Sequence, residues 1–266
     1  MYKEYLPCHI LAPYVDRYWE FKGQTEQGMQ IKLSTDGCTD FMFILETTVN
    51  HGIMMQPYHS YFIGPMNVCS TLITSSGTIN TFGVRFRPFG LSCFMKIPLS
   101  ELTNIRVSVN DLDTIFSDSF AERLFEEQGI QCKINLIERY LKEHLYKSSH
   151  TMDAQIAYAV NQINAHEGKI SISHLMDEVN LCQRHFERKF KLHTGFTQKY
   201  NSIVKFKNAI KILRNESFDN LLSVAVKAGY YDASHLSREI KKLSGSTPNF
   251  FLSLPLDNET TIIYTK

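Results

Sequence analysis

The chain has 266 residues, of which 43% are hydrophobic and 21% are charged, and its formal net charge at pH 7 is +1. This composition is typical of a folded chain and excludes collagen-like proteins, coiled-coil rods and largely disordered proteins. No run approaches the roughly 18 consecutive apolar residues of a membrane-spanning helix, and residues 1–7 lack the apolar core of a secretory signal. We therefore expect a cytoplasmic protein with no membrane partner.

The cysteines are expected to be reduced thiols. They are spread singly along the chain, with no C-x-x-C pair and no short disulfide framework, which fits a reducing compartment. The six positions are Cys8, Cys38, Cys69, Cys93, Cys132 and Cys182.

Residues 14–87 predict short antiparallel strands. Aromatic and β-branched residues gather in short runs, and Gly, Pro, Asp and Ser separate these runs. Several short strands with this punctuation are typical of a β-sandwich or a small barrel. The five expected strands are Tyr14–Phe21, Thr39–Leu45, Tyr58–Ile63, Val68–Thr74 and Thr78–Arg87.

After Pro88 the pattern changes to helices. Phe120–Gln128 and Ile134–Lys147 have apolar residues at helical spacing, and the second segment carries a clear apolar stripe. An amphipathic pair of this kind either covers the sheet or meets a second copy of itself, so a homodimer through the Ile134–Leu145 helix is one expected assembly. The stripe consists of Ile134, Ile137, Tyr140, Leu141 and Leu145.

A polar stretch at residues 146–153 predicts a domain boundary, because it has no apolar period. We expect an α+β chain with a β-rich domain at residues 1–115, a helical dimerisation or coupling region at 116–147, and an all-helical domain at 154–254. No strand is expected between Ala154 and about Leu252.

Two segments of the helical domain each predict a helix, a tight turn and a second helix. In the first, Ser171 caps the first helix and Asn180 forms the turn; in the second, Gly229 forms the turn and Asp232 caps the second helix. Glycine allows the positive φ angle that such a turn needs, and asparagine is the next most tolerant residue. Thr197–Arg214 predicts a longer amphipathic helix that acts as a rigid spacer between the two units.

The charge of the chain is concentrated in this helical domain. Residues 1–150 carry 13 Lys and Arg against 16 Asp and Glu, whereas residues 151–266 carry 15 against 11. Between Leu181 and Arg214, nine basic residues face only Glu187, a local net charge of +8. Such a segment is suited to a polyanionic partner.

The second helix of each unit carries a polar stripe that can read DNA bases. If Phe186 and Phe190 face inward, the outward stripe of the first helix offers Arg for guanine, Gln for adenine, Glu for cytosine and Lys for phosphate. The second unit offers a smaller and less charged stripe. The expected DNA-contacting residues are Gln183, Arg184, Glu187, Arg188 and Lys191 in the first unit, and Ala233, Ser234, Ser237, Arg238 and Lys241 in the second.

The alternative interpretation of these stripes is an ordinary solvated helix surface. A single exposed Arg does not distinguish a DNA-binding surface from an ordinary solvated surface. A strongly basic window on one of two repeated helix pairs favours double-stranded DNA as the partner.

Residues 172–252 resemble the paired helix-turn-helix DNA-binding domain of the AraC/XylS family of bacterial transcription regulators. The resemblance is carried by the segments Leu181–Phe190, Thr194–Thr197, Lys205–Ala209, Ala228–Asp232 and Ser234–Arg238, with Ser244-Gly245 and Thr247-Pro248 after them. It implies that the two reading helices enter successive major-groove segments on one face of the duplex, about 34 Å apart. Met176, Lys205 and Leu236 depart from the family's usual Ala, Arg and Phe.

The N-terminal half also resembles a sensory domain found in one branch of this family. The matching segments are Tyr14–Trp19, Thr35–Asp40, Phe62–Pro65 and Gly83–Pro88. The resemblance implies a cupin-like fold and a regulatory role, and it names no ligand.

Five residues of the β-rich half are candidates for binding a small-molecule effector: Trp19, Phe41, Phe43, Arg85 and Arg87. The aromatic residues suit an apolar cavity and the arginines an anion. A packed core accounts equally well for the aromatic residues, and pairing with Asp or Glu accounts for the arginines. His51 and His59 form no ligand cluster, so we expect no metal, and no cofactor motif is present.

Together these features predict a sequence-specific transcription regulator, and no enzyme. Its expected partners are double-stranded DNA, a small-molecule effector, a second copy of the chain and RNA polymerase, which an activator would contact. Two alternatives remain open: a cupin-type enzyme that acts on a small molecule, and a non-specific architectural DNA-binding protein.

Overall fold

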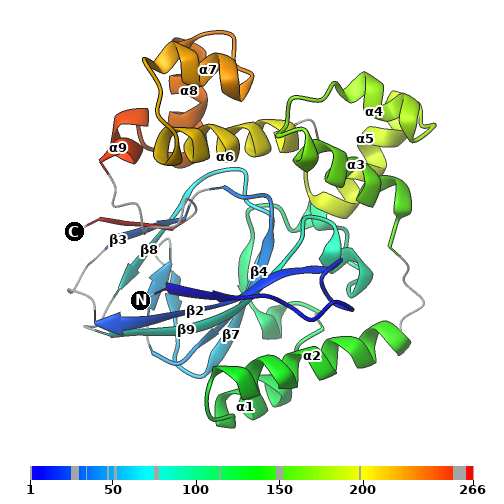
Figure 1. The fold of residues 1–266 in the computed structure, drawn as a ribbon. Coiled ribbons are helices and arrows are strands. Elements are labelled where there is room, and N and C mark those ends of the chain that lie inside the picture. The colour runs from blue at the N-terminus through cyan, green and yellow to red at the C-terminus, as the bar shows by residue number, and fades with distance from the viewer. Residues whose placement is uncertain are drawn as a thin grey trace.

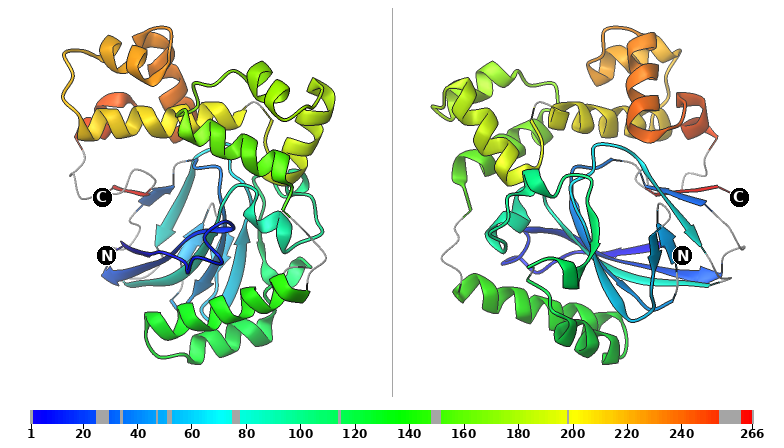
Figure 2. Two further views of the ribbon diagram at one scale, coloured as in Figure 1. Left: turned by 45° about the vertical axis from the view of Figure 1, so that its right-hand side comes forward. Right: turned by 180° about the vertical axis from the view of Figure 1, so that it is seen from behind.

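The computed structural model describes residues 2–24, 30–33, 35–46, 48–50, 53–74, 78–113, 115–147, 152–197, 199–253 and 262–265. Two antiparallel sheets form the N-terminal part, and a helical domain lies across one end of them (Figures 1 and 2). Within the described ranges, no helix is long and apolar enough to span a bilayer.

The larger sheet has six strands in the order β1-β2-β9-β4-β7-β10, and the smaller has five in the order β11-β3-β8-β5-β6. The six strands are β1 (Tyr2–Tyr5), β2 (Val15–Gln24), β4 (Thr39–Ile44), β7 (His59–Ile63), β9 (Thr78–Phe86) and β10 (Arg106–Ser108). The five are β3 (Gln30–Leu33), β5 (Thr48–Asn50), β6 (Ile53–Met55), β8 (Ser70–Thr74) and β11 (Ile262–Thr265). The five predicted strands correspond to β2, β4, β7, β8 and β9.

Side chains alternate across the central strand β4, and both faces of this strand are buried. Phe41 and Phe43 face one core, in which they lie edge-on against Phe116. Met42 and Ile44 face the other core, together with Trp19. This is the period of two expected of a strand, here with apolar residues on both sides.

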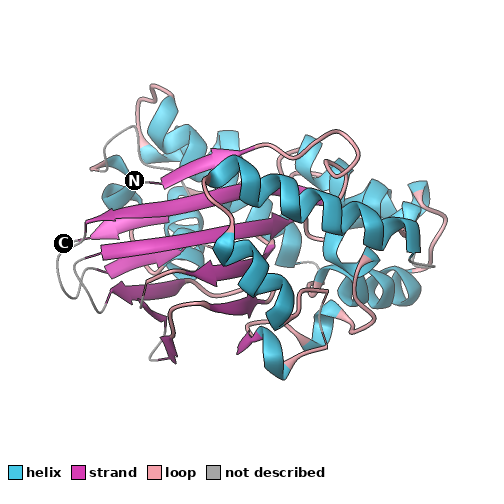
Figure 3. Cartoon of the chain, turned by 90° about the horizontal axis from the view of Figure 1, so that it is seen from below, coloured by secondary structure: helices cyan, strands magenta, loops and turns pink. Residues whose placement is uncertain are grey.

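Two helices cover the first of these faces: α1 (Asp118–Glu126) and α2 (Ile130–Lys147) (Figure 3). The apolar stripe of α2 packs into the same core as Phe41, and Ile137 and Leu141 are completely buried. The stripe is therefore covered by the chain's own sheet, which is the first of the two alternatives that the sequence left open. The outer side of α2 is polar, with Gln131, Asn135 and Arg139 exposed.

A buried network of charges joins three elements of the larger sheet. Arg85 on β9 donates from Nη1 to Asp36 Oδ2 over 3.0 Å and from Nε to Asp40 Oδ1 over 3.0 Å. Trp19 Nε1 donates to the same Asp40 oxygen over 2.8 Å. The indole ring of Trp19 lies against Gly83, where a Cβ atom would come within 2.1 Å of it. The network fixes the segment 35–38, which precedes β4.

The chain between β9 and α1 forms three short 3-10 helices: η1 (Gly90–Cys93), η2 (Leu99–Glu101) and η3 (Val109–Asp111). In the described part of the chain after α2, seven helices follow: α3 (Ala154–Ala165), α4 (Ile172–Glu178), α5 (Gln183–Thr194), α6 (Lys199–Asn215), α7 (Leu221–Ala228), α8 (Ala233–Ser244) and α9 (Pro248–Leu252). These helices share one core, which also includes Phe89 of the N-terminal part.

The chain then returns to the β domain, because β11 pairs with β3 in the smaller sheet. The sequence did not predict this strand. The helical domain is therefore connected to the β domain on both sides.

We predict that Arg85→Met lowers the free energy of unfolding by about 3–5 kcal/mol, because it leaves two carboxylates buried without their cation. Urea unfolding followed by tryptophan fluorescence measures the change, since Trp19 lies in the network. Arg139→Met, on the exposed side of α2, is the control and should change stability by less than about 0.5 kcal/mol. Equal midpoints for the two variants would contradict a structural role for the network.

Candidate nucleic-acid interface

The turns of the two helix-turn-helix units have the same backbone geometry. Asn180 has a φ angle of 52° and Gly229 one of 82°. After each turn residue, the next amide donates back across five positions, from Leu181 N to Met176 O over 3.1 Å and from Tyr230 N to Ala225 O over 2.8 Å. This satisfies the last carbonyls of α4 and α7. The predicted roles of Asn180 and Gly229 in the turns are confirmed.

The caps of the two units differ. Asp232 caps α8 through its side chain, which accepts a hydrogen bond from His235 N over 2.6 Å. Ser171 stands at the cap of α4 and makes no side-chain capping bond. Asp153 caps α3, which precedes the first unit, by accepting hydrogen bonds from the amides of Gln155 and Ile156.

The two reading helices, α5 and α8, have the same length and end in the same way. Each has 12 residues and ends at a glycine with positive φ, Gly195 at 80° and Gly245 at 68°. The residue before each glycine also makes the same bonds. Thr194 Oγ1 donates to Phe190 O and accepts from Phe196 N, and the Ser244 hydroxyl does the same with Ile240 and Ser246.

The C-terminal ends of α5 and α8 both contact the β domain, so the two helices have the same polarity relative to it. Thr103 Oγ1 donates to Gly195 O over 3.0 Å, and Thr35 Oγ1 donates to Leu243 O over 3.3 Å. The N-terminal ends of α5 and α8 therefore point away from the β domain, from opposite ends of α6 (Figure 1). In helix-turn-helix proteins these N-terminal residues contact base edges.

On α5 the structure places the predicted stripe at the surface. Gln183, Arg184, Arg188 and Lys191 are exposed, and Glu187 is partly exposed. Gln183 Nε2 donates to Glu187 Oε1 over 3.0 Å, four positions apart on the same face. Phe186 and Phe190 are buried on the opposite side.

The stripe of α8 has the same arrangement with smaller side chains. Ser234, Arg238 and Lys241 are exposed, whereas Ala233 and Ser237 are partly exposed. The Ser237 hydroxyl donates to Ala233 O over 2.8 Å, which leaves its oxygen to accept a further bond. Arg238 and Lys241 are thus the long donors of this helix.

The other basic residues of the +8 segment do not share one surface. Lys189 pairs with Asp153 over 2.7 Å and also donates to Gln155, so it joins α5 to α3. Arg214 is buried on α6. The exposed basic surface of the helical domain is therefore narrower than the net charge of +8 in this segment indicated.

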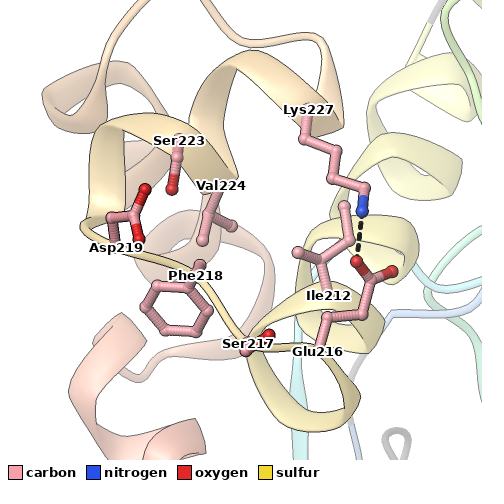
Figure 4. A pocket seen from close by; sticks show the side chains of 8 residues that line it. All are labelled: Ile212, Glu216, Ser217, Phe218, Asp219, Ser223, Val224 and Lys227. Atoms are coloured by element: carbon pink, nitrogen blue, oxygen red, sulfur yellow. Dashed lines mark hydrogen bonds and ion pairs between the residues drawn. The ribbon is translucent and has the colours of Figure 1, made fainter.

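A small cleft of about 260 Å³ lies between the end of α6 and the second unit (Figure 4). Ile212, Phe218 and Val224 form its apolar side. Lys227 on α7 forms an ion pair with Glu216, which follows α6. Lys205 Nζ reaches Gly229 O over 3.3 Å and joins α6 to the turn itself.

The five predicted effector-binding residues do not converge on one cavity. Phe41 and Phe43 face the helices α1 and α2, whereas Trp19 lies on the other side of the larger sheet. Arg85 is held by Asp36 and Asp40, and Arg87 Nε donates to the Ala12 carbonyl over 2.7 Å.

A cleft of about 540 Å³ lies instead where the two domains meet. Asp36 contributes to it from the β domain, and the remaining lining comes from α3, α6 and the residues beside them: Asn164, Ala165, Glu167, Val204, Lys207, Asn208, Lys211 and Asn215. This lining offers ammonium and amide donors as well as carboxylates to a polar molecule. A molecule in this cleft would contact Asp36 of the β domain as well as α6 of the helical domain.

In the part of the chain that the structure describes, no group of three or more His, Cys, Asp or Glu is placed to hold a metal ion. His59 is exposed at the start of β7. His51 lies outside the described residues.

Two features of the interface were missed in the sequence. Tyr231, directly before the cap residue of α8, is 88% exposed. Its neighbour Tyr230 is buried, and the sequence alone does not tell the two apart. The second missed feature is the pairing of Asp153 with Lys189, which joins residues far apart in the chain.

We predict a pH-dependent effect for Asp153→Asn. Burial raises the pKa of Asp153, but the hydrogen bonds from Lys189 and Ile156 and the charges of Lys189 and His193 outweigh it, and the pKa lies below its usual value. Its carboxylate therefore stabilises the fold above about pH 4, and this contribution is lost as the pH falls through the lowered pKa. Asparagine keeps the cap but not the charge. The variant should lose about 1 kcal/mol at pH 7 and much less at pH 3, measured by urea unfolding.

We also predict that the two caps differ in strength. Asp232→Ala should lower the free energy of unfolding by about 1 kcal/mol, because it removes the acceptor of the His235 amide. Ser171→Ala, at a cap without a side-chain bond, should cost less than about 0.5 kcal/mol. Urea denaturation followed by circular dichroism at 222 nm compares them. An equal loss in both variants would count against the capping geometry.

Comparison with known proteins supports this architecture. Residues 3–108 match a family described as a domain of unknown function, DUF6597. No curated protein sequence matches the chain. The described fold is similar to that of ToxT from Vibrio cholerae, with a TM-score of 0.52 and 9% sequence identity, over 88% of this chain and 97% of ToxT.

Two shorter structures each match less than half of the chain. The DNA-binding domain of AdpA, solved in complex with a target DNA, is 19% identical over 37% of this chain and 90% of that domain, with a TM-score of 0.35. The C-terminal domain of AraT, a response regulator from Geobacillus stearothermophilus, is 18% identical over 41% of this chain and 92% of that domain, with a TM-score of 0.37. The likeness to ToxT shows that the chain has a two-domain fold of the kind expected from its sequence: an N-terminal antiparallel β domain and a C-terminal helical domain with two helix-turn-helix units.

Proposed function

We propose that the chain is a sequence-specific, double-stranded DNA-binding transcription regulator of the AraC/XylS type. The observation that carries the proposal is the pairing of two equivalent reading helices, α5 and α8. Both are held at their C-terminal ends by the β domain, and both carry exposed Arg and Lys side chains.

The two helices are suited to different parts of the recognition. The stripe of α5 combines Arg184 and Arg188 with the acceptor Glu187, so it can discriminate between base pairs at several positions. The stripe of α8 has Arg238 as its one arginine, with the small side chains of Ala233 and Ser234 near its start. We propose that α5 supplies most of the base discrimination and that α8 supplies a weaker second contact.

Control by a small molecule is the second part of the proposal. A ligand shifts the balance between two domain arrangements only if it binds one of them better, and a tenfold preference corresponds to about 1.4 kcal/mol. The cleft between Asp36 and α6 supports such a preference, because a molecule in it would contact both domains. The effector-binding set named from the sequence receives no such support, since its members lie on different faces of the sheet.

This function places the protein in the cytoplasm, where its DNA target lies, and involves no catalytic step. The homodimer and the contact with RNA polymerase remain predictions. A dimer would have to use a surface other than the buried stripe of α2.

The test is selection of bound sequences from random duplexes with the full chain, followed by affinity measurements on the recovered motif at rising salt. We predict that Arg188→Ala costs about 1–3 kcal/mol and relaxes one base position. Lys191→Gln should weaken binding to all sequences alike and reduce the salt dependence by about one phosphate contact.

Arg123→Ala is the matched control, since Arg123 is exposed on α1, in the β-domain half of the chain. It should change neither affinity nor motif. Equal binding to all duplexes, with no recovered motif, would point to an architectural DNA-binding protein and would end the proposal of a specific regulator.

A further inference from the structure

The two reading helices are held by the β domain at equivalent positions. Their terminal glycines, Gly195 and Gly245, occupy the same place in the two units, directly after α5 and α8. A Cβ atom on Gly195 would come within 2.8 Å of Pro65 Cγ, and one on Gly245 within 3.1 Å of Cys69 Sγ. Pro65 and Cys69 lie four residues apart, between β7 and β8, so one short segment of the β domain touches the ends of both helices.

Hydrogen bonds accompany both contacts. Thr103 reaches Gly195 O at the end of α5, where His193 Nδ1 also lies 3.2 Å from the Ser92 hydroxyl. Thr35 reaches Leu243 O at the end of α8 in a buried bond. The β domain therefore contacts each reading helix through a close van der Waals contact and a hydrogen bond to its last turn.

A third contact lies between these two, at the start of α6. Gly37 has a φ angle of 78°, and a Cβ atom there would come within 2.7 Å of Tyr200 Cε2. The segment 35–38 that provides Gly37 and Thr35 is fixed by the bond from Arg85 to Asp36. The helical domain is thus held at three points by segments that are themselves anchored in the larger sheet.

A small rotation of a reading helix at its contact with the β domain produces a large movement of its far end. A helix of 12 residues is about 18 Å long, so a tilt of about 10° moves its far end by about 3 Å. Successive base pairs of a duplex lie about 3.4 Å apart. A small rotation at the docked end of α5 or α8 therefore moves its reading end by about one base pair.

We propose that the β domain acts as a brace that sets the relative position of the two reading helices, and that Pro65, Cys69 and Thr103 thereby determine which separation of the two contacted DNA segments is bound. These residues are positioning residues, since they lie at the helix ends turned away from the DNA-contacting side. The consequence for DNA rests on the proposed function, whereas the bracing itself does not.

The brace is tested first without DNA, as the distance between α5 and α8. His185 and His235 occupy equivalent exposed positions on the two helices, outside the proposed DNA-contacting set. Genetically encoded spin-label amino acids at both positions report the distance distribution in the full chain by pulsed electron spin resonance, and they leave the native cysteines intact.

We predict that Cys69→Phe, which forces bulk against Gly245, shifts the mean distance by about 3 Å or broadens the distribution about twofold. Cys132→Phe, the same exchange at an exposed position of α2, should leave the distribution unchanged. Thr103→Val removes the hydrogen bond to Gly195 O at nearly constant side-chain volume and should broaden the distance distribution. This variant replaces Cys69→Phe in the test if Cys69→Phe does not fold. An unchanged distribution in every folded variant of Cys69 and Thr103 would overturn the proposal.

The consequence for DNA is tested on duplexes in which the recovered segments are moved apart or together by one base pair. The parent chain should lose about tenfold in affinity at each altered spacing, and Cys69→Phe or Thr103→Val should lose less than about threefold or prefer a new spacing. If the parent chain and the variants lose the same affinity at the altered spacings, the brace does not determine which spacing is bound. A chain that binds no duplex would refute the proposed function, and the distances would still decide whether the brace exists.

Discussion

The interaction on which the domain arrangement depends is the buried bonding of Arg85 to Asp36 and Asp40. Two carboxylates and one guanidinium lie in a site that is almost closed to solvent, where an unpaired charge would cost several kcal/mol. Asp40 is part of a central strand, but Asp36 belongs to the segment before it. Residues 35–38 are not part of a strand, but the ion pair between Arg85 and Asp36 holds them rigidly against the sheet.

That segment is also the one on which the helical domain rests. Gly37 lies against Tyr200, and Thr35 bonds to the last turn of α8. Glycine is required at residue 37 for two independent reasons: its backbone is left-handed, and a side chain would overlap an aromatic ring. Gly195 at the end of α5 also has a left-handed backbone, and a side chain there would come too close to Pro65. The two domains can thus approach closely because glycine stands at residues 37 and 195. Next to each contact a threonine, Thr35 or Thr103, makes a hydrogen bond to the helical domain.

Much of this architecture could be predicted from local sequence. The turns at Asn180 and Gly229 and the cap at Asp232 depend on the chemistry of single residues, and the exposed stripe of α5 depends on the positions of Phe186 and Phe190. Short edge strands such as β1 and β10 were missed because their pairing partners, not their own sequences, define them. The fate of the α2 stripe could not be decided either, because an apolar stripe looks the same whether it covers a sheet or a second molecule.

The residues proposed to bind an effector also show that local sequence does not predict which side chains come together. Phe41 and Phe43 were grouped with Trp19 because all three are aromatic and lie on predicted strands, yet Phe41 and Trp19 lie on opposite sides of one sheet. Strand registers decide this, and they are long-range properties. Conversely, the sequence segments at Asp36, Pro65 and Arg85 that resembled a sensory domain lie at or beside the contact with the helical domain. In this chain those segments are placed to connect the two domains, so a change in the β domain that moves Asp36 or Pro65 acts directly on the ends of the reading helices.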